Sequence, residues 1–312
     1  MKDRLLVLAA SGEVREGARI FHAKLRAMKT EPRGREGQGQ AMTPFLRSSS
    51  FLLLQQEGHL ISSCLTTGLT QLRAANVHNK GAFYAALFNL SVGFERLLKA
   101  TIIIDHMLKN NLSVPTRKQL KVYGHDILEL YGSCVAISLA EPRKLSPLEA
   151  LEANAREILL LFNEFAQTTR YHNLDALSSA NSGKDPLVHW NEILLSILKS
   201  DVSSRSKAKI VSTASAVASA IADKTTTLMQ GLDKQALSTE EALVLPGLHD
   251  QAVKHAVLYI VKLLSPVRYL ISDLSHKAYT IGVSVPPFPQ MQEFLEWLWD
   301  DRDFVLRKKK WP

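Results

Sequence analysis

Long stretches of the chain carry apolar residues at every third or fourth position, and short polar or proline-containing breaks separate these stretches. The clearest example covers residues 80–110, where Phe83, Leu87, Leu90 and Phe94 stand at helical spacing. This is the period of an amphipathic helix. Segments that alternate apolar and polar residues, as half-buried strands do, are nearly absent. The pattern therefore predicts an all-α protein.

Breaks at proline, glycine and polar clusters divide the chain into expected helices. Ser146, Pro147 and Glu149 resemble the cap and first turn of one helix, and residues 238–241 resemble the start of another. The expected helices cover residues 49–76, 80–110, 125–139, 146–169, 187–199, 203–231, 250–278 and 290–299.

These elements predict three parts of the chain. Residues 1–48 combine one or two basic amphipathic helices with a glycine-rich loop, EPRGREGQGQ. Residues 49–202 form a helical bundle, and residues 203–312 form a C-terminal helical region. The pattern leaves open whether that last region is a separate domain.

The net charge of the chain bears on the kind of partner it binds. Lys and Arg number 38 against 30 Asp and Glu, so the formal charge is +8 and the pI is about 9.4. A basic balance favours a polyanionic partner such as RNA, with an ordinary basic soluble protein as the alternative. Two cysteines, Cys64 and Cys134, build neither a disulfide framework nor a zinc site, and their apolar neighbours predict burial.

Several classes of protein are disfavoured by missing motifs. No stretch reaches the roughly 18 apolar residues of a membrane span, and the first apolar run is too short for a signal peptide. The histidines form no HExxH motif, the glycine-rich loop lacks the Lys-Ser/Thr of a phosphate loop, and no GxSxG elbow occurs. We therefore expect a cytoplasmic protein without a metal or cofactor.

The stretch FAQTTRYHNLDAL, residues 165–177, gathers candidate catalytic side chains. Arg170, His172 and Asp175 could act together, with Asn173 beside them. On a regular helix Arg170 and His172 point about 200° apart, so they converge only if the segment is a turn, which Asn173 permits.

The same stretch has a structural interpretation. In that interpretation Arg170 pairs with Asp175 or Glu164, and Tyr171 and Leu174 enter the core. Asn173 or Asp175 would then cap the following turn.

Two further basic patterns carry a choice between function and structure. Arg73 and His78 could hold a phosphate and move a proton, although so short a pattern also arises by chance. The cations of the C-terminal tail could bind the phosphates of a nucleic acid while Trp311 stacks on a base. The alternative is a solvated terminus without a binding role. The cations of that tail are Arg307, Lys308, Lys309 and Lys310.

Three stretches in order, GFERLLKA (93–100), YGHDILELY (123–131) and TRYHNLD (169–175), resemble the motif order of the HEPN superfamily. The resemblance covers about residues 80–199 and implies an antiparallel helical bundle. Many members are metal-independent ribonucleases of toxin and phage-defence systems. They dimerise so that an Arg-x4–6-His motif from each subunit forms one cleft.

The resemblance implies that Arg170 corresponds to the family's arginine, which holds the scissile phosphate. Asp175 stands where the family has histidine, which gives a degenerate Arg-x4-Asp motif, and a carboxylate there repels phosphate. Glu95 and His125 fall on the first two motifs and are expected beside the site or in contact with RNA. A contact between His125 and Glu95 across the bundle is one expectation, and a simple helix-start position for His125 is the other.

The leading hypothesis is a HEPN-like homodimer directed at RNA, either a metal-independent ribonuclease or a non-cleaving RNA binder, in bacterial phage defence or toxin systems. The alternative from another class is a helical scaffold that binds a partner protein without catalysis. A third hypothesis is a regulator that neutralises a partner enzyme.

Overall fold

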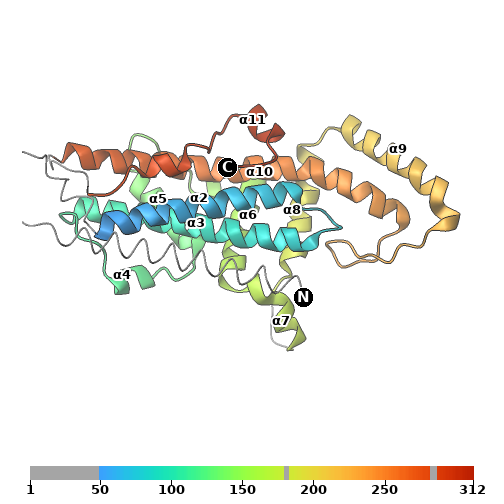
Figure 1. Ribbon diagram of the computed structural model, residues 1–312, viewed down its shortest axis with the longest axis horizontal. Helices are drawn as coiled ribbons and strands as arrows, with labels where there is room; N and C mark the ends of the chain where they lie inside the picture. Colours follow the sequence, from blue (N-terminus) through green and yellow to red (C-terminus); the bar gives the residue numbers. More distant parts are fainter. Residues whose placement is uncertain (1–48, 179–182, 282–286) are drawn as a thin grey trace, which may run out of the picture. The chain divides into compact units, whose positions relative to one another are not determined.

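The computed structural model describes residues 49–178, 183–281 and 287–312 (Figure 1). The basic helices and the glycine-rich loop expected before residue 49 lie outside these ranges. The described residues form one compact unit. Within the described ranges the backbone is helix and loop, with one isolated antiparallel bridge between Gln230 and Ala236. The predicted all-α class is confirmed.

The helices have the following bounds. The α-helices are α2 (Ser49–Ala74), α3 (Lys80–Lys109), α4 (Arg117–Lys121), α5 (Ile127–Ser138), α6 (Ala153–Gln167), α7 (His172–Leu177), α8 (Pro186–Ser200), α9 (Ser204–Ile221), α10 (Thr239–Thr280) and α11 (Arg302–Arg307). The 3-10 turns are η2 (Leu148–Ala150), η3 (Thr169–Tyr171), η4 (Ala222–Lys224) and η5 (Met291–Leu295).

The core is built around α3, which packs against α2, α5, α6 and α10 (Figure 1). The apolar stripe predicted from the sequence faces inward, since Phe83, Leu87, Leu90 and Phe94 are fully buried. In turn, α10 packs against α2, α6, α8 and α9. Its buried apolar side chains from Ala252 to Ala278 belong to the same hydrophobic cluster as those of α3. The C-terminal region therefore completes the core of the bundle, which answers the question that the sequence left open.

Two glycines let α2 and α3 approach closely. A Cβ added at Gly93 would lie 2.9 Å from the side chain of Leu65, and one at Gly68 would lie 2.7 Å from the side chain of Leu90. Both leucines are fully buried and cannot swing into solvent. The glycine of GFERLLKA thus has a packing role at the α2–α3 contact.

Three predicted helices have different bounds in the structure. Pro147 opens only the 3-10 turn η2, and Leu151 is extended, so α6 begins at Ala153 rather than at residue 146. The helix expected over 203–231 ends at Ile221, before a run of threonines that favours extended backbone. The segment expected as a helix over 290–299 holds only the turn η5.

The last long helix begins earlier than predicted. Ser238 and Glu241 form a capping box, in which each side chain accepts from the other residue's backbone N–H, so α10 starts at Thr239. The helix continues through Pro246 and Pro266. Proline removes one backbone hydrogen bond, yet extensive packing keeps this helix continuous. Among the described helices we find none with the length and apolar character of a membrane span.

Candidate functional site

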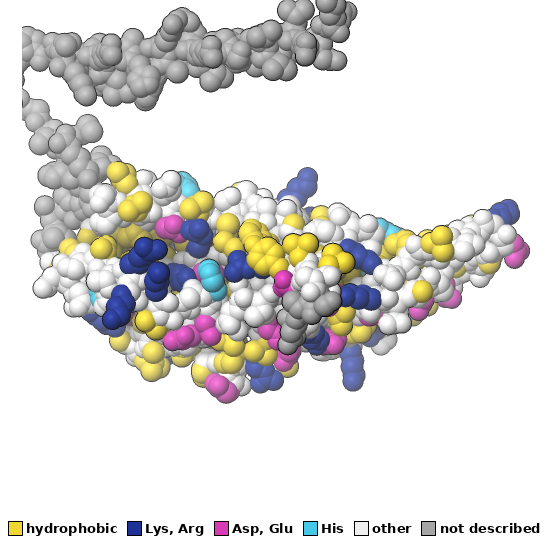
Figure 2. Space-filling view, turned by 90° about the horizontal axis from the view of Figure 1, so that it is seen from below, with side chains coloured by type: hydrophobic (Ala, Val, Ile, Leu, Met, Phe, Trp, Pro, Cys, Tyr) yellow, Lys and Arg dark blue, Asp and Glu magenta, His cyan; other side chains and the backbone are white. Residues whose placement is uncertain are grey.

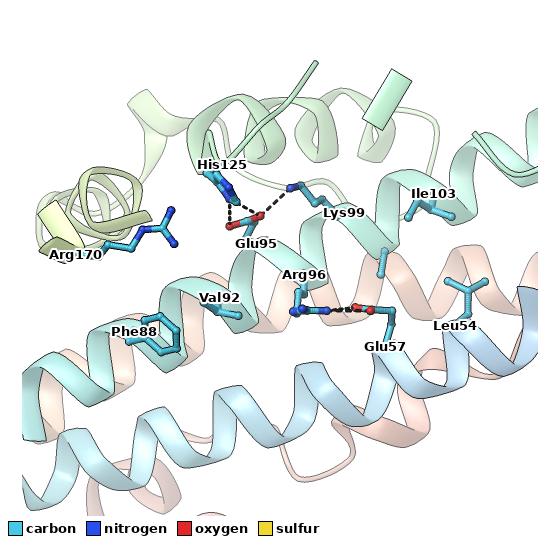
Figure 3. A pocket seen from close by; sticks show the side chains of 11 residues that line it. Leu54, Glu57, Phe88, Val92, Glu95, Arg96, Lys99, Ile103, His125 and Arg170 are labelled. Carbon is cyan, nitrogen blue, oxygen red and sulfur yellow. Dashed lines mark hydrogen bonds and ion pairs between the residues drawn. The ribbon is translucent and has the colours of Figure 1, made fainter. Parts of the chain in front are cut away.

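The outer face of α3 forms the floor of an open pocket of about 570 Å³, which we call the α3 pocket (Figure 3). Its lining comes from α2, α3, the turn before α5 and the turn after α6. The lining residues that matter for chemistry are Phe88, Glu95, Arg96, Lys99, His125 and Arg170. Glu95, His125 and Arg170, one from each motif of the sequence, therefore meet at one place.

Glu95 is the centre of this arrangement. Lys99, one helical turn further along α3, places Nζ 2.7 Å from Glu95 Oε1. His125 Nδ1 lies 3.1 and 3.2 Å from the two carboxylate oxygens, which confirms the expected contact across the bundle. A carboxylate only accepts, so Nδ1 donates and Nε2 is left to accept or release a proton. The His125 side chain is 56% exposed, whereas that of Glu95 is only 13% exposed.

The Gly-His-Asp turn holds His125 in place. Gly124 adopts φ +50°, a left-handed conformation that favours glycine, and its carbonyl accepts a 2.6 Å hydrogen bond from Lys99 Nζ. Asp126 caps α5 by accepting from the backbone N–H of Glu129 at 2.9 Å. Asn163 of α6 accepts from the backbone N–H of Ile127. The turn is thus fixed at both ends, and His125 projects over α3.

Arg170 reaches the α3 pocket from the turn η3. Its guanidinium donates to the carbonyl oxygen of Ala166 at 2.8 Å and extends toward the His125–Glu95 pair (Figure 3). Among the salt bridges of the described residues, none involves Arg170. The expected pairing with Asp175 or Glu164 is therefore wrong, and Glu164 contacts His189 instead at 3.1 Å. The positive charge of Arg170 is available to a ligand in the pocket.

His172 does not join Arg170. The turn η3 and the start of α7 carry its ring into the interior, where it is 6% exposed and its Nε2 lies 3.4 Å from Asp185. Lys234 contacts the same carboxylate at 2.7 Å. Burial alone would raise the pKa of Asp185, but hydrogen bonds from Lys234 and the backbone N–H of Leu187 hold it below its usual value. His172 belongs to an interior ion-pair cluster, so the predicted Arg170–His172 catalytic cluster is wrong.

The rest of the TRYHNLD stretch also departs from prediction. Asp175 and Asn173 lie on the short helix α7 and do not line the α3 pocket. Tyr171 is 60% exposed and Leu174 is 64% exposed, so their expected entry into the core is wrong. Arg170 is the residue of this stretch that reaches the pocket.

A second open pocket of about 600 Å³ adjoins the first and shares Lys99 and His125 with it; we call it the α4 pocket. Thr116 and Gln119 form a capping box at the start of α4, which sets Arg117 and Lys121 one turn apart on this pocket. Figure 2 shows basic side chains around a histidine beside an apolar patch on one face of the molecule.

Positive charge exceeds negative charge across the two pockets. Glu57 neutralises Arg96 through a 2.7 Å contact, and Glu95 lies against Lys99. Among the described residues of the lining, five cations face these two carboxylates: Arg96, Lys99, Arg117, Lys121 and Arg170. The combined surface therefore suits an anion longer than a single phosphate.

Arg73 of the Arg73–His78 pattern serves the fold. The Arg73 side chain is 3% exposed, lies 3.6 Å from Asp250 and donates to the carbonyl oxygen of Lys308 at 3.2 Å. Desolvation lowers the pKa of Arg73 and the Asp250 carboxylate partly offsets this effect. Arg73 joins α2, α10 and the tail, so the phosphate-binding interpretation of Arg73 is wrong.

The C-terminal tail is packed rather than solvated. The backbone N–H of Trp311 donates to Thr70 Oγ1 at 2.9 Å, and the indole is 8% exposed. Trp311 is therefore not free to stack on a base, although Arg307, Lys309 and Lys310 are exposed. The tail residues 307–310 line neither the α3 pocket nor the α4 pocket.

Within the described ranges, no three His, Cys, Asp or Glu side chains form a group that could hold a metal ion. Cys134 is buried as expected, whereas Cys64 is only half-buried. Burial raises the pKa of the Cys64 thiol, which disfavours the reactive thiolate.

Sequence reasoning missed Phe88, Arg117 and Lys121 as site residues. Phe88 directly follows Leu87 and therefore does not belong to the buried apolar stripe. This position in the helical period could have indicated that the Phe88 ring is exposed. Arg117 and Lys121 lie in a loop segment that the apolar pattern does not predict as helix. Their place beside His125 depends on tertiary packing.

Comparison of the chain with protein-family models, with curated proteins and with solved structures finds no match in any of the three.

Proposed function

We propose that this protein is a HEPN-like, RNA-directed protein of the cytoplasm, of the kind that serves phage defence or toxin systems in bacteria. One observation carries the proposal. Three stretches that resemble HEPN motifs and lie far apart in the sequence bring Glu95, His125 and Arg170 to one open, predominantly basic pocket.

Phosphate recognition is the first part of the proposal. A guanidinium binds a phosphate through two parallel N–H donors, and Arg170 has no competing carboxylate among the described salt bridges. Lys99, Arg117 and Lys121 extend the positive surface past His125. Contacts of this kind supply most of the sequence-independent affinity for nucleic acid.

Proton transfer is the second part. Glu95 orients the His125 ring through Nδ1, which leaves Nε2 for a substrate proton. RNA supplies its own nucleophile: the 2′-oxygen attacks the phosphorus, gives its proton to Nε2, and the 5′-oxygen leaves and takes a proton from water. Arg170 would stabilise the charge that develops on the phosphate oxygens. We therefore assign to His125 the role that the sequence gave to His172 and Asp175. In the homodimer expected of a HEPN-like protein, a second copy would add a second His125.

RNA binding at low salt without metal tests the proposal. We expect wild-type protein to bind labelled RNA in the presence of EDTA, with an affinity that falls as salt rises. Arg170→Ala should weaken binding by about 10- to 100-fold, because a charged hydrogen bond is lost. The matched control is Arg205→Ala, since Arg205 is exposed at the start of α9 and lies outside both pockets. Equal weakening by both variants, or no RNA binding, would contradict the proposal.

The same mixtures separate a ribonuclease from a binder. If the protein cleaves RNA, His125→Gln should abolish cleavage and retain most of the binding, because the ring supplies the proton acceptor while the cations hold the phosphates. Cleavage that survives His125→Gln would rule out this role for His125. Binding without any cleavage would identify a non-cleaving RNA binder.

A scaffold that binds a partner protein is the second candidate, and one observation favours it. A groove of about 580 Å³ between α9 and α10 carries the half-exposed apolar side chains Ile210, Val217 and Leu243. Only Ala214 and Ala218 of α9 are buried. A stoichiometric protein partner that resists nuclease, together with failure to bind RNA, would favour this candidate.

A further inference from the structure

From the make-up of the α3 pocket we infer that its occupant is single-stranded RNA, with one base stacked on Phe88 while Arg170 holds a neighbouring phosphate. This inference rests on the proposed function and adds the class of RNA and the residue that selects it.

Phe88 is an exposed aromatic side chain at the edge of the site. Its side chain is 49% exposed, whereas its neighbour Leu87 is fully buried. Phe88 and Arg170 line the same pocket, and Val92 continues the apolar edge one turn further along α3 (Figure 3). An aromatic face beside a cation is the pairing that binds single-stranded nucleic acid, because the ring stacks on a base while the cation holds the backbone.

Spacing along α3 sets the extent of the occupant. Phe88, Val92, Glu95 and Lys99 follow one helical face, and the rise of the helix separates Phe88 from Lys99 by about 16 Å. The α4 pocket continues the basic surface beyond Lys99 with Arg117 and Lys121. An occupant that reaches both ends needs a base at the Phe88 end and further phosphates at the Lys99 end. A short strand meets this requirement, and a mononucleotide does not.

The inference also excludes paired RNA as the preferred occupant. In an A-form helix the bases are stacked on one another and paired, so no base face is free for Phe88. Unpaired bases in loops or single strands can turn outward onto the ring. Duplex RNA would use the cations alone and bind more weakly.

Competition binding tests this inference with the full chain in EDTA. A fluorescent single-stranded RNA is displaced by unlabelled single-stranded RNA, duplex RNA or single-stranded DNA of the same length. We expect Phe88→Ala to weaken single-strand binding roughly 5- to 100-fold, and Phe88→Trp to preserve it, because stacking needs an aromatic face. Trp299→Ala is the control, since Trp299 is 62% exposed and lies outside both pockets. Thermal melting of each variant reports folding.

The outcomes separate this inference from the proposed function. If Arg170→Ala weakens RNA binding while Phe88→Ala binds like the wild type, the stacking inference is overturned and the RNA site stands. Duplex RNA that competes as well as the single strand overturns the inference in the same way. Equal competition by single-stranded DNA would overturn the assignment to RNA. If the wild type binds no RNA, the proposed function fails and this inference with it.

Discussion

At the scale of single residues, Glu95 explains why the candidate site is ordered. Its carboxylate accepts from Lys99 at 2.7 Å and from His125 at 3.1 Å, and so joins α3 to the turn before α5. A side chain that is 13% exposed in contact with two donors is held more firmly than an exposed ion pair. The site thus has a fixed acceptor on its floor, and the exposed cations Arg117 and Lys121 lie at its rim.

The sequence predicted part of this site. The motif order correctly placed Glu95, His125 and Arg170 near one another, because the turn before α5 and the turn after α6 both lie beside α3. It failed for His172, whose direction is set by the turn η3 and whose partner Asp185 lies 13 residues further along the chain. Helical geometry alone does not predict that the side chain of His172 contacts the buried carboxylate of Asp185.

His249 gives a prediction about pH. It is 2% exposed on α10, its Nδ1 has no hydrogen-bond partner within the described residues, and burial lowers its pKa from 6.5 to about 4. The unfolded chain therefore binds the proton more readily than the folded chain between these values. The associated stability is fully present above pH 6.5 and falls as pH drops toward 4, by about 3 kcal/mol in total.

Urea unfolding between pH 7.5 and pH 4 measures this effect. The variant His249→Phe removes the titrating group and should lose less stability over the same range than the wild type. Identical pH profiles for the two proteins would show that His249 is not the group responsible.

At the scale of elements, the long helices were predictable and their ends were not. The apolar period of residues 80–110 predicted both ends of α3 to within one residue. The period is clear because one face of this helix is buried in the core. The long helix expected over 250–278 was placed too late, because the helix start recognised at residues 238–241 is the start of α10 itself and the helix continues through Pro246. Local cap chemistry and tertiary packing together decided that boundary.

The α2–α3 contact gives a prediction about stability. Gly93→Ala should destabilise the fold by about 1–2 kcal/mol, because the new Cβ would lie 2.9 Å from the buried side chain of Leu65. Gly132→Ala is the matched control within α5, where an added Cβ meets nothing within 4 Å. That change should stabilise by about 0.5–1 kcal/mol through helix propensity. Denaturant midpoints measure both values, and a Gly93→Ala protein as stable as wild type would contradict the close approach.

At the scale of the whole molecule, the described residues form one compact unit with one main hydrophobic cluster. The helix α10 buries side chains in the same cluster as α2, α3, α6 and α8, and the packed tail returns to α2 through Trp311 and Arg73. Sequence patterns indicate which face of each helix is apolar, but they do not indicate which helices share a core. That is why the sequence could not decide the status of residues 203–312.

The central claim is that RNA lies across the α3 and α4 pockets, and ultraviolet cross-linking tests it most directly. Full-length protein is irradiated with uridine-rich single-stranded RNA, and the cross-linked peptides are mapped by mass spectrometry. We expect cross-links within residues 83–103, 117–126 and 165–171, and fewer of them in Arg170→Ala. Cross-links confined to the basic tail, residues 307–310, or to α9 would contradict the claim.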